Sequence, residues 1–124
     1  MKILIAEDHQ YLGPGLVKIL MRMYPAARIC LAKDGNEGLM VYSQLKPDLV
    51  ITDWNMPPGM NGGQLAIAIK ERNPNQKIIL WSGSLCPTNY SQYFTYILPK
   101  DMDSCLWRDM VEEALHGKND NTTI

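Results

Sequence analysis

The sequence has no excess of charge of one sign and no stripe of basic residues. Twelve Lys and Arg side chains nearly balance thirteen Asp and Glu side chains over 124 residues. A protein that binds nucleic acid carries a concentrated positive patch. Because the spacing of these basic residues predicts no such patch, we expect no direct contact with nucleic acid.

Cysteine is scarce. The three cysteines, Cys30, Cys86 and Cys105, are widely spaced and include no CxxC pair. Their odd number argues against a disulfide framework, and their spacing argues against a zinc site. We expect reduced thiols that are mostly buried.

Long hydrophobic runs are also absent. The longest, such as residues 77–81, have the length of a strand and are far too short to span a membrane. At the N-terminus, Glu7 and Asp8 come too early for the apolar core of a signal peptide. We therefore expect a cytoplasmic protein without a membrane partner.

Hydrophobic residues nevertheless make up 46% of the chain. This content is enough for one domain with its own core, and the length leaves no room for a second domain. We expect the domain to occupy residues 1–117 and residues 118–124 to form a polar tail.

Strand-like and helix-like segments alternate along the chain. Short runs rich in β-branched residues predict five strands, at residues 2–6, 28–32, 48–53, 77–82 and 96–98. Between them, apolar residues recur on single helical faces. These residues are Leu12, Leu16, Ile19, Leu20 and Met23, then Leu65, Ala66 and Ile69, then Leu106, Met110, Ala114 and Leu115. Pro25, Pro47 and Pro74 each stand where a helix should stop, and Gly117 is the expected C-cap of the last helix.

The third and fourth of these strands are almost continuously apolar. Such strands are typical of the centre of a parallel sheet that has helices on both faces. We therefore predict a doubly wound α/β domain with three α/β/α layers and a five-stranded parallel sheet in the order 2-1-3-4-5.

In a sheet of this order, the functional site lies beyond the carboxyl ends of the first and third strands. Glu7 and Asp8 follow the first strand, and Asp53 ends the third. Three carboxylates in one small volume repel one another, and such a cluster usually persists because a hard divalent cation neutralises it. Mg²⁺ suits a site of few carboxylates completed by water and phosphate oxygens, so we expect this ion as the cofactor.

Two further polar side chains complete the predicted site. The fourth strand ends in Ser82, and Lys100 follows the fifth strand. This set suits phosphoryl transfer to a carboxylate, with Asp53 as the nucleophile and with the hydroxyl and the ammonium contacting the phosphoryl oxygens. A metal and a lysine on opposite sides can stabilise the transition state without a general base.

Four short motifs stand at these strand ends. They are Ile5-Ala-Glu-Asp-His9, Val50-Ile-Thr-Asp-Trp-Asn-Met-Pro57, Ser82-Gly83 and Leu98-Pro-Lys100. Each is weak alone, but in this order they are highly specific, and the chain resembles the receiver (CheY-like) domain family from residue 1 to about residue 117. The resemblance implies a flavodoxin-like fold and a phosphoacceptor in bacterial signalling rather than an enzyme.

The resemblance also implies metal ligands and partners. The Mg²⁺ site would comprise the side chains of Glu7, Asp8 and Asp53 and the backbone carbonyl of Asn55. The phosphoryl donor would be a phosphohistidine of a sensor histidine kinase or of a phosphotransfer protein. Slow self-dephosphorylation would end the signal, which would pass to a downstream protein target.

The chain departs from the family pattern in three places. Ile97 stands where the family has an aromatic residue that swings inward, and Asp101 replaces the usual proline after the lysine. The loop at residues 56–62 is one residue longer than usual. The segment from Ser82 to Lys100 is about one helical turn shorter and contains Pro87, so we expect a short, irregular or mobile fourth helix and an atypical output surface.

Other functions stay open on sequence alone. Ile97 and the shortened segment suggest an interaction module that keeps this fold but acts without phosphorylation. A magnesium-dependent phosphohydrolase would share the aspartyl-phosphate intermediate, although its usual DxD motif would stand at the end of the first strand. A flavin carrier would share only the fold, and acidic strand ends oppose its anionic phosphate.

Several nearby residues have a structural interpretation. We interpret His9 as a loop side chain, and we predict that Trp54 and Trp81 pack on opposite sides of the sheet because alternate strand residues face opposite ways. The aromatic residues of the shortened segment form either an exposed partner surface or ordinary cover over the sheet edge. They are Tyr90, Tyr93, Phe94 and Tyr96.

Overall fold

Five parallel strands form one sheet in the order β2-β1-β3-β4-β5. The computed structural model describes residues 1–117, and the predicted tail, residues 118–124, lies outside the described residues. The strands are β1 (Lys2–Ala6), β2 (Arg28–Ala32), β3 (Leu49–Thr52), β4 (Lys77–Ser82) and β5 (Tyr96–Pro99). The predicted order and all five strands are confirmed. Asp48 and Asp53 lie just outside β3, and Pro99 extends β5 by one residue.

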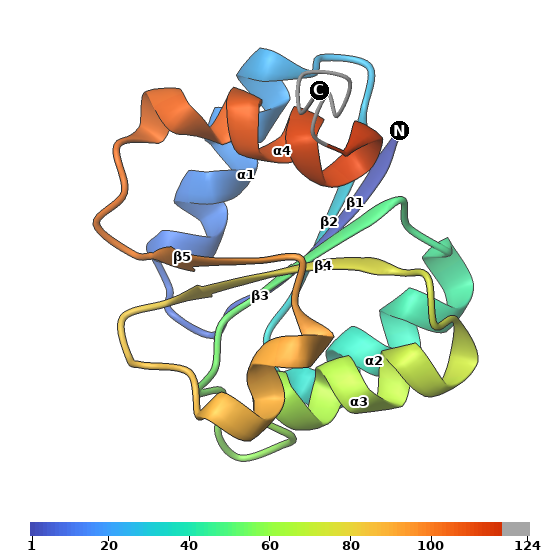
Figure 1. Ribbon diagram of the computed structural model, residues 1–124. Helices are drawn as coiled ribbons and strands as arrows, with labels where there is room; N and C mark the ends of the chain where they lie inside the picture. The colour runs from blue at the N-terminus through green and yellow to red at the C-terminus, as the bar shows by residue number, and fades with distance from the viewer. Residues whose placement is uncertain (118–124) are drawn as a thin grey trace, which may run out of the picture.

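Helices cover both faces of the sheet. They are α1 (Leu12–Met23), α2 (Gly35–Leu45), α3 (Gly62–Arg72) and α4 (Trp107–His116), with short 3-10 helices η1 (Thr88–Tyr93) and η2 (Ser104–Leu106). Figure 1 shows α1 and α4 on one face and α2 and α3 on the other. This arrangement confirms the predicted three-layer, flavodoxin-like architecture.

Alternate residues of each central strand enter two separate cores. Ile3 and Ile5 of β1 pack with α1 and α4, whereas Leu4 and Ala6 pack with α2 and α3. Both faces of these strands are therefore buried. For this reason β3 and β4 are continuously apolar rather than alternating.

The helices end where the prolines predict. Each of Pro25, Pro47 and Pro74 stands two residues beyond the last residue of its helix. Gly117 is the C-cap of α4, with a φ of 73° and a backbone N–H that donates to Glu113 O. At its start, α3 carries a capping box in which Asn61 and Gln64 exchange hydrogen bonds between side chain and backbone.

The apolar face of α4 differs from the prediction. Leu106 is 44% exposed, whereas Trp107, Val111 and Ala114 are buried. The prediction was wrong for Leu106 and Met110, because Leu106 belongs to η2 and α4 begins only at Trp107. It is confirmed for Ala114 and Leu115, which pack on the core that α1 and α4 cover. The predicted faces of α1 and α3 are confirmed except for Leu12, which begins α1 and is 37% exposed.

The prediction that the cysteines are mostly buried was wrong. Cys105 is exposed in the short turn of η2, and Cys30 and Cys86 are only half-buried. Cys30 lies on β2, an edge strand that the helices cover incompletely. All three are free thiols, as expected.

The segment after β4 holds η1, a 3-10 helix of six residues, in place of a regular fourth helix. This confirms the short, irregular element predicted from Pro87. Phe94 is buried, and Tyr90 and Tyr93 are half-buried against the core that α2 and α3 cover. Of the two alternatives left open by the sequence, these three rings therefore fit cover over the sheet rather than an exposed partner surface.

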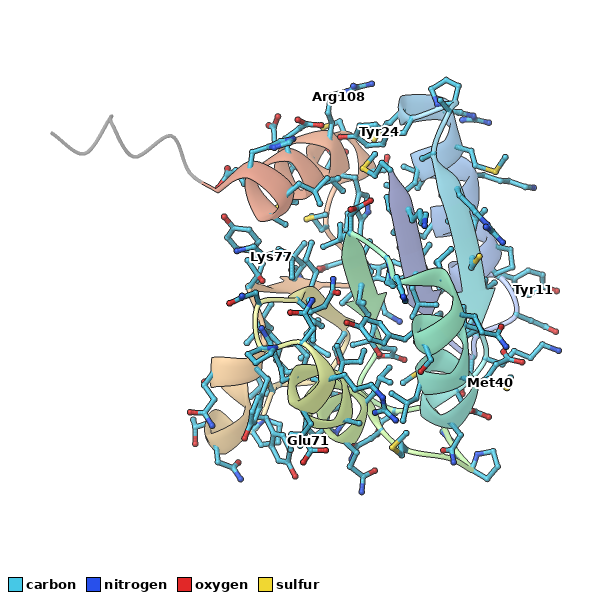
Figure 2. The ribbon with its side chains drawn as sticks, turned by 90° about the vertical axis from the view of Figure 1, so that its right-hand side faces the viewer. Tyr11, Tyr24, Met40, Glu71, Lys77 and Arg108 are labelled. Atoms are coloured by element: carbon cyan, nitrogen blue, oxygen red, sulfur yellow. The ribbon has the colours of Figure 1, made fainter. Side chains whose placement is uncertain are left out.

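The C-terminal end of α1 contacts α4 through a polar cluster. Tyr24 donates its hydroxyl proton to Glu112 Oε2 at 2.7 Å, and Arg108 lies over the Tyr24 ring at 5.4 Å (Figure 2). Partial burial and the Glu112 carboxylate raise the pKa of Tyr24 to about 12.

Within residues 1–117, no helix combines the length and the apolar character that a membrane span requires.

Candidate functional site

The ends of β1 and β3 place two acidic side chains next to each other. Ala6 and Thr52 are partners in the parallel register, and the next residues are Glu7 and Asp53. The ladder continues past both strand ends, because Asp53 N–H donates to Ala6 O and Glu7 N–H donates to Ala32 O, each at 2.9 Å. Backbone hydrogen bonds therefore fix the positions of both acids.

Glu7, Asp8 and Asp53 form one acidic cluster. Each offers a carboxylate oxygen, and these oxygens lie within 4.8 Å of one another. Glu7 is 2% and Asp53 9% exposed, whereas Asp8 is exposed. Carboxylate oxygens that open to solvent on one side are the donor set that Mg²⁺ accepts, so these residues fit the predicted ion. Asn55, the fourth predicted ligand through its carbonyl, lies two residues after Asp53 in an exposed part of the loop.

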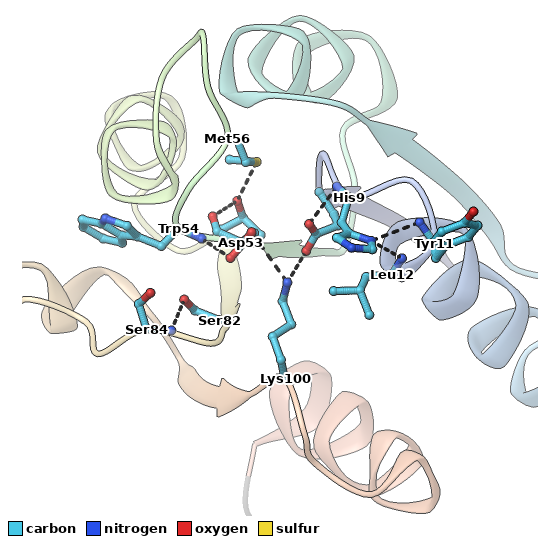
Figure 3. Close-up of polar contacts among 11 residues, drawn as sticks. His9, Tyr11, Leu12, Asp53, Trp54, Met56, Ser82, Ser84 and Lys100 are labelled. Carbon is cyan, nitrogen blue, oxygen red and sulfur yellow. Dashed lines mark hydrogen bonds and ion pairs between the residues drawn. The ribbon is translucent and has the colours of Figure 1, made fainter.

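Lys100 neutralises part of this negative charge. Its Nζ lies 2.5 Å from Glu7 Oε1 and 3.6 Å from Asp53 Oδ2 (Figure 3). The second oxygen of each acid accepts a backbone N–H: Glu7 Oε2 from His9 at 3.1 Å and Asp53 Oδ1 from Trp54 at 2.7 Å. The ammonium thus contacts both acids that the sheet aligns.

The buried position of Glu7 shifts its protonation. Burial raises the pKa of this carboxyl, and the hydrogen bonds from Lys100 and from the His9 backbone only partly oppose the effect. The negative charge of Asp53 adds to the rise. A bound cation would oppose this rise in pKa, because it would stabilise the charged form of both carboxyls.

Ser82 lies at the end of β4 but makes a local contact. The side chain is 6% exposed, and its oxygen accepts the Ser84 backbone N–H at 3.1 Å. In the described part of the chain, no hydrogen bond joins Ser82 to Asp53 or to Lys100. The structure therefore brings four of the five predicted side chains into direct proximity and leaves Ser82 bonded to its own loop.

Comparison with known proteins identifies the family. The model of the response regulator receiver domain matches residues 3–117. The chain belongs to this family. The resemblance seen in the four motifs is confirmed, and as a receiver domain the chain is a phosphoacceptor signalling module of two-component systems rather than an enzyme.

Named relatives agree with this assignment. The chain is 33% identical to the nitrate/nitrite response regulator protein NarL of Escherichia coli, over 91% of this chain and 50% of the relative. It is 30% identical to the oxygen regulatory protein NreC of Staphylococcus haemolyticus, over 93% of this chain and 51% of the relative. The receiver domain thus spans about half the length of these curated relatives.

A solved structure shares the fold throughout. The signal receiver domain of a DNA-binding response regulator from Colwellia psychrerythraea superposes with a TM-score of 0.80 at 25% identity. The match covers 91% of this chain and 96% of that chain.

The departures from the receiver pattern have clear positions. Ile97 lies on β5 and is 44% exposed. Its side chain is aliphatic, so this position carries no aromatic ring. The neighbouring Tyr96 points to the other face, where its hydroxyl donates to Glu113 Oε1 at 2.9 Å. Tyr96 therefore does not replace the missing ring. The Lys100–Asp101 peptide is trans, since the cis peptide bond found within residues 1–117 is Pro57–Pro58.

The structural interpretations of the nearby side chains are confirmed. The exposed His9 accepts the N–H groups of Tyr11 and Leu12 on Nδ1, at 3.1 and 3.3 Å, where α1 begins. Trp54 packs on the side of α2 and α3, and Trp81 packs on the side of α1 and α4.

Two contributors to the site were not predicted. The Trp81 ring lies beneath the Lys100 ammonium, 4.5 Å from Nζ to the ring centroid. A Cβ on Gly62 would stand 2.1 Å from the carbonyl oxygen of Asp53, so only glycine fits there. The first could have been inferred, because Trp81 pairs with Leu98 and Lys100 follows two residues later on the same face. The second has no signal in one sequence, because the close approach depends on the loop path.

Proposed function

We propose that Asp53 accepts a phosphoryl group from a phosphohistidine of a sensor histidine kinase or of a phosphotransfer protein. The observation that carries this proposal is the position of Asp53 within one cluster of three carboxylates that Lys100 contacts. Trp54 N–H donates to Asp53 Oδ1, whereas Oδ2 accepts no hydrogen bond in the part of the chain described. Oδ2 is therefore the oxygen available for attack. Residues 1–117 would form the receiver domain.

The side chains around Asp53 would have different roles in phosphoryl transfer. Glu7, Asp8 and Asp53, with the carbonyl of Asn55, would hold Mg²⁺, which supplies positive charge beside the phosphoryl oxygens. Lys100 supplies a second positive charge from within 3.6 Å of Asp53 Oδ2. Ser82 accepts a hydrogen bond from Ser84 N–H, which leaves its own O–H free to donate to a phosphoryl oxygen.

Phosphorylation would then shift an existing equilibrium between two conformations of the receiver. The segment that follows Ser82 would carry the change to a downstream protein, with no direct contact to nucleic acid or membrane. The domain would act in the cytoplasm, where its donor presents the phosphohistidine.

Transfer from acetyl phosphate in the presence of Mg²⁺, followed by intact mass, tests the proposal. The wild type should gain one phosphoryl group, and Asp53→Asn should gain none because an amide is a poor nucleophile. The gain should also disappear when EDTA removes the metal. A phosphoryl group on Asp53→Asn, or an unmodified wild type, would overturn the assignment.

Two observations favour a second candidate. Ile97 has no aromatic ring that could swing inward, and η1 takes the place of a regular helix between β4 and β5. A receiver fold that binds its partner without phosphorylation would share both features. Beryllofluoride with Mg²⁺ separates the candidates: a change in the amide NMR spectrum around Ser82 and η1 supports the switch, and partner binding that is equal for wild type and Asp53→Asn supports the constitutive module.

A further inference from the structure

Four side chains of the site share one side of the sheet. Glu7, Asp53, Trp81 and Lys100 each stand two residues after a strand residue that packs toward α1 and α4. Those strand residues are Ile5, Ile51, Ile79 and Leu98. Because side chains two residues apart on a strand point the same way, this alternation aims the two acids, the ring and the ammonium into one volume.

The Lys100 ammonium is enclosed by these three groups. Glu7 Oε1 lies at 2.5 Å, Asp53 Oδ2 at 3.6 Å and the Trp81 ring centroid at 4.5 Å from Nζ. The Lys100 side chain is 17% exposed. A ring face attracts a cation through its quadrupole and leaves the cation's protons free for the carboxylates.

The ring itself is fixed by packing. Trp81 is 6% exposed and meets Trp107 edge to face, with centroids 5.7 Å apart and planes at 78°. Trp107 is 2% exposed and is the first residue of α4. The position of the Trp81 face is therefore set by the core and not by the lysine.

We propose that Trp81 is a positioning residue that holds the Lys100 ammonium beside Asp53. This inference rests on the function proposed above. Glu7 is the nearer anion and would draw the flexible lysine toward β1. The fixed ring face gives the ammonium a third contact that keeps it between the two acids, within reach of a phosphoryl group on Asp53.

A set of three variants separates this role from ordinary core packing. Trp81→Phe keeps a ring face, and Trp81→Leu keeps apolar volume without a ring. Ile79→Val shortens the buried residue two positions earlier on the same strand face and controls for lost packing. Urea unfolding of each variant gives the stability against which the other measurements are compared.

The first readout is the NMR shift of the Lys100 ε-methylene protons, which needs no phosphorylation. The ring current of Trp81 should move these protons upfield of the other lysines in the wild type, in Trp81→Phe and in Ile79→Val. In Trp81→Leu they should return to the range of exposed lysines. Unshifted Lys100 protons in the wild type would overturn the inference without any variant, so it stays falsifiable even if Trp81→Leu does not fold.

The second readout is the rate of phosphorylation by acetyl phosphate with Mg²⁺. Loss of the cation–π contact in Trp81→Leu should slow phosphorylation by about threefold to thirtyfold. Trp81→Phe keeps a smaller ring face and should slow it less than Trp81→Leu does, and Ile79→Val should stay near the wild type. An equal rate in Trp81→Leu would refute the positioning role. If the wild type itself is not phosphorylated, the proposed function fails, and the proton shifts alone decide whether Trp81 holds Lys100.

Discussion

The loops that leave β3 and β4 differ in how firmly they are held. In the loop after β3, Met56 is 1% exposed, Met60 N–H donates to Asn36 Oδ1, and Gly62 N–H donates to Trp54 O. In the loop after β4, Leu85 is 95% exposed, and a Cβ on Gly83 would find only the Lys100 side chain, 3.9 Å away. One loop is tied to the core and to α2, and the other lies open on the surface.

This difference separates two tasks within one site. Asp53 begins the held loop, so its carboxylate is already in place before a metal or a phosphoryl group arrives. Ser82 is the buried last residue of β4, and the open loop follows it. Because this loop has few buried contacts, a change in its conformation would cost little free energy. On the function proposed above, Asp53 would be the fixed acceptor, and the loop after Ser82 would be the part that responds to phosphorylation.

The largest expected effect compares one apolar residue from each loop. Met56→Ala should lower the free energy of unfolding by about 2–5 kcal/mol, because it opens a cavity in the core. Leu85→Ala should change it by less than about 0.5 kcal/mol, because the side chain is almost fully in water. Urea unfolding followed by circular dichroism measures both. Similar values for the two variants would contradict the comparison.

A pair of glycines tests the same contrast through the backbone. The added Cβ of Gly62→Ala would overlap the Asp53 carbonyl and should cost about 1–3 kcal/mol of stability. Gly83→Ala has room for its Cβ and should stay within about 0.5 kcal/mol of the wild type. Thermal unfolding compares the two, and amide shifts around Asp53 should move only in Gly62→Ala. A stable Gly62→Ala would mean that the held loop is able to adjust.

The smallest effect concerns the buried carboxylate of Glu7, which follows β1. Folding raises the pKa of Glu7, so the folded protein binds a proton at this carboxyl more tightly than the unfolded protein does. The stability that this proton contributes is lost as the pH rises from the ordinary pKa of 4.5 through the raised pKa. Glu7→Gln mimics the protonated form. In metal-free buffer it should unfold at a higher temperature than the wild type at neutral pH.

The advantage of Glu7→Gln should shrink as the pH falls toward 4.5, where the wild type is protonated as well. Melting curves over this range in EDTA measure the difference. A difference that does not vary with pH would show that the variant acts through packing and not through charge. Glu71→Gln makes the same chemical change at an exposed position of α3, outside the site, and is a suitable control.

Much of the fold could be predicted because each signal is local. The prolines mark helix ends through their missing N–H and their effect on the preceding residue, and continuous apolar runs mark buried strands. The errors arose where burial depends on distant parts of the chain. Cys30 has ordinary apolar surroundings in sequence, but its strand lies at the sheet edge. Leu106 fits the helical spacing, but a 3-10 turn precedes α4.

The candidate site follows the same division. The sequence placed Glu7, Asp53 and Lys100 at strand ends, and parallel strands bring such ends to one edge of the sheet. It predicted the lysine opposite the cation and did not predict that Lys100 contacts Glu7 more closely than Asp53. That preference depends on how the sheet places two residues, Glu7 and Lys100, that are 93 positions apart in the chain.

The sequence by itself determined the order of elements and the chemical inventory of the site, because both depend on residue type and short-range spacing. Only the tertiary structure decided which side of the sheet edge each group faces, which acid the lysine contacts first, and which of the two loops is held. Those properties depend on strand register and on packing between segments far apart in the chain, and neither is encoded in any single stretch of residues.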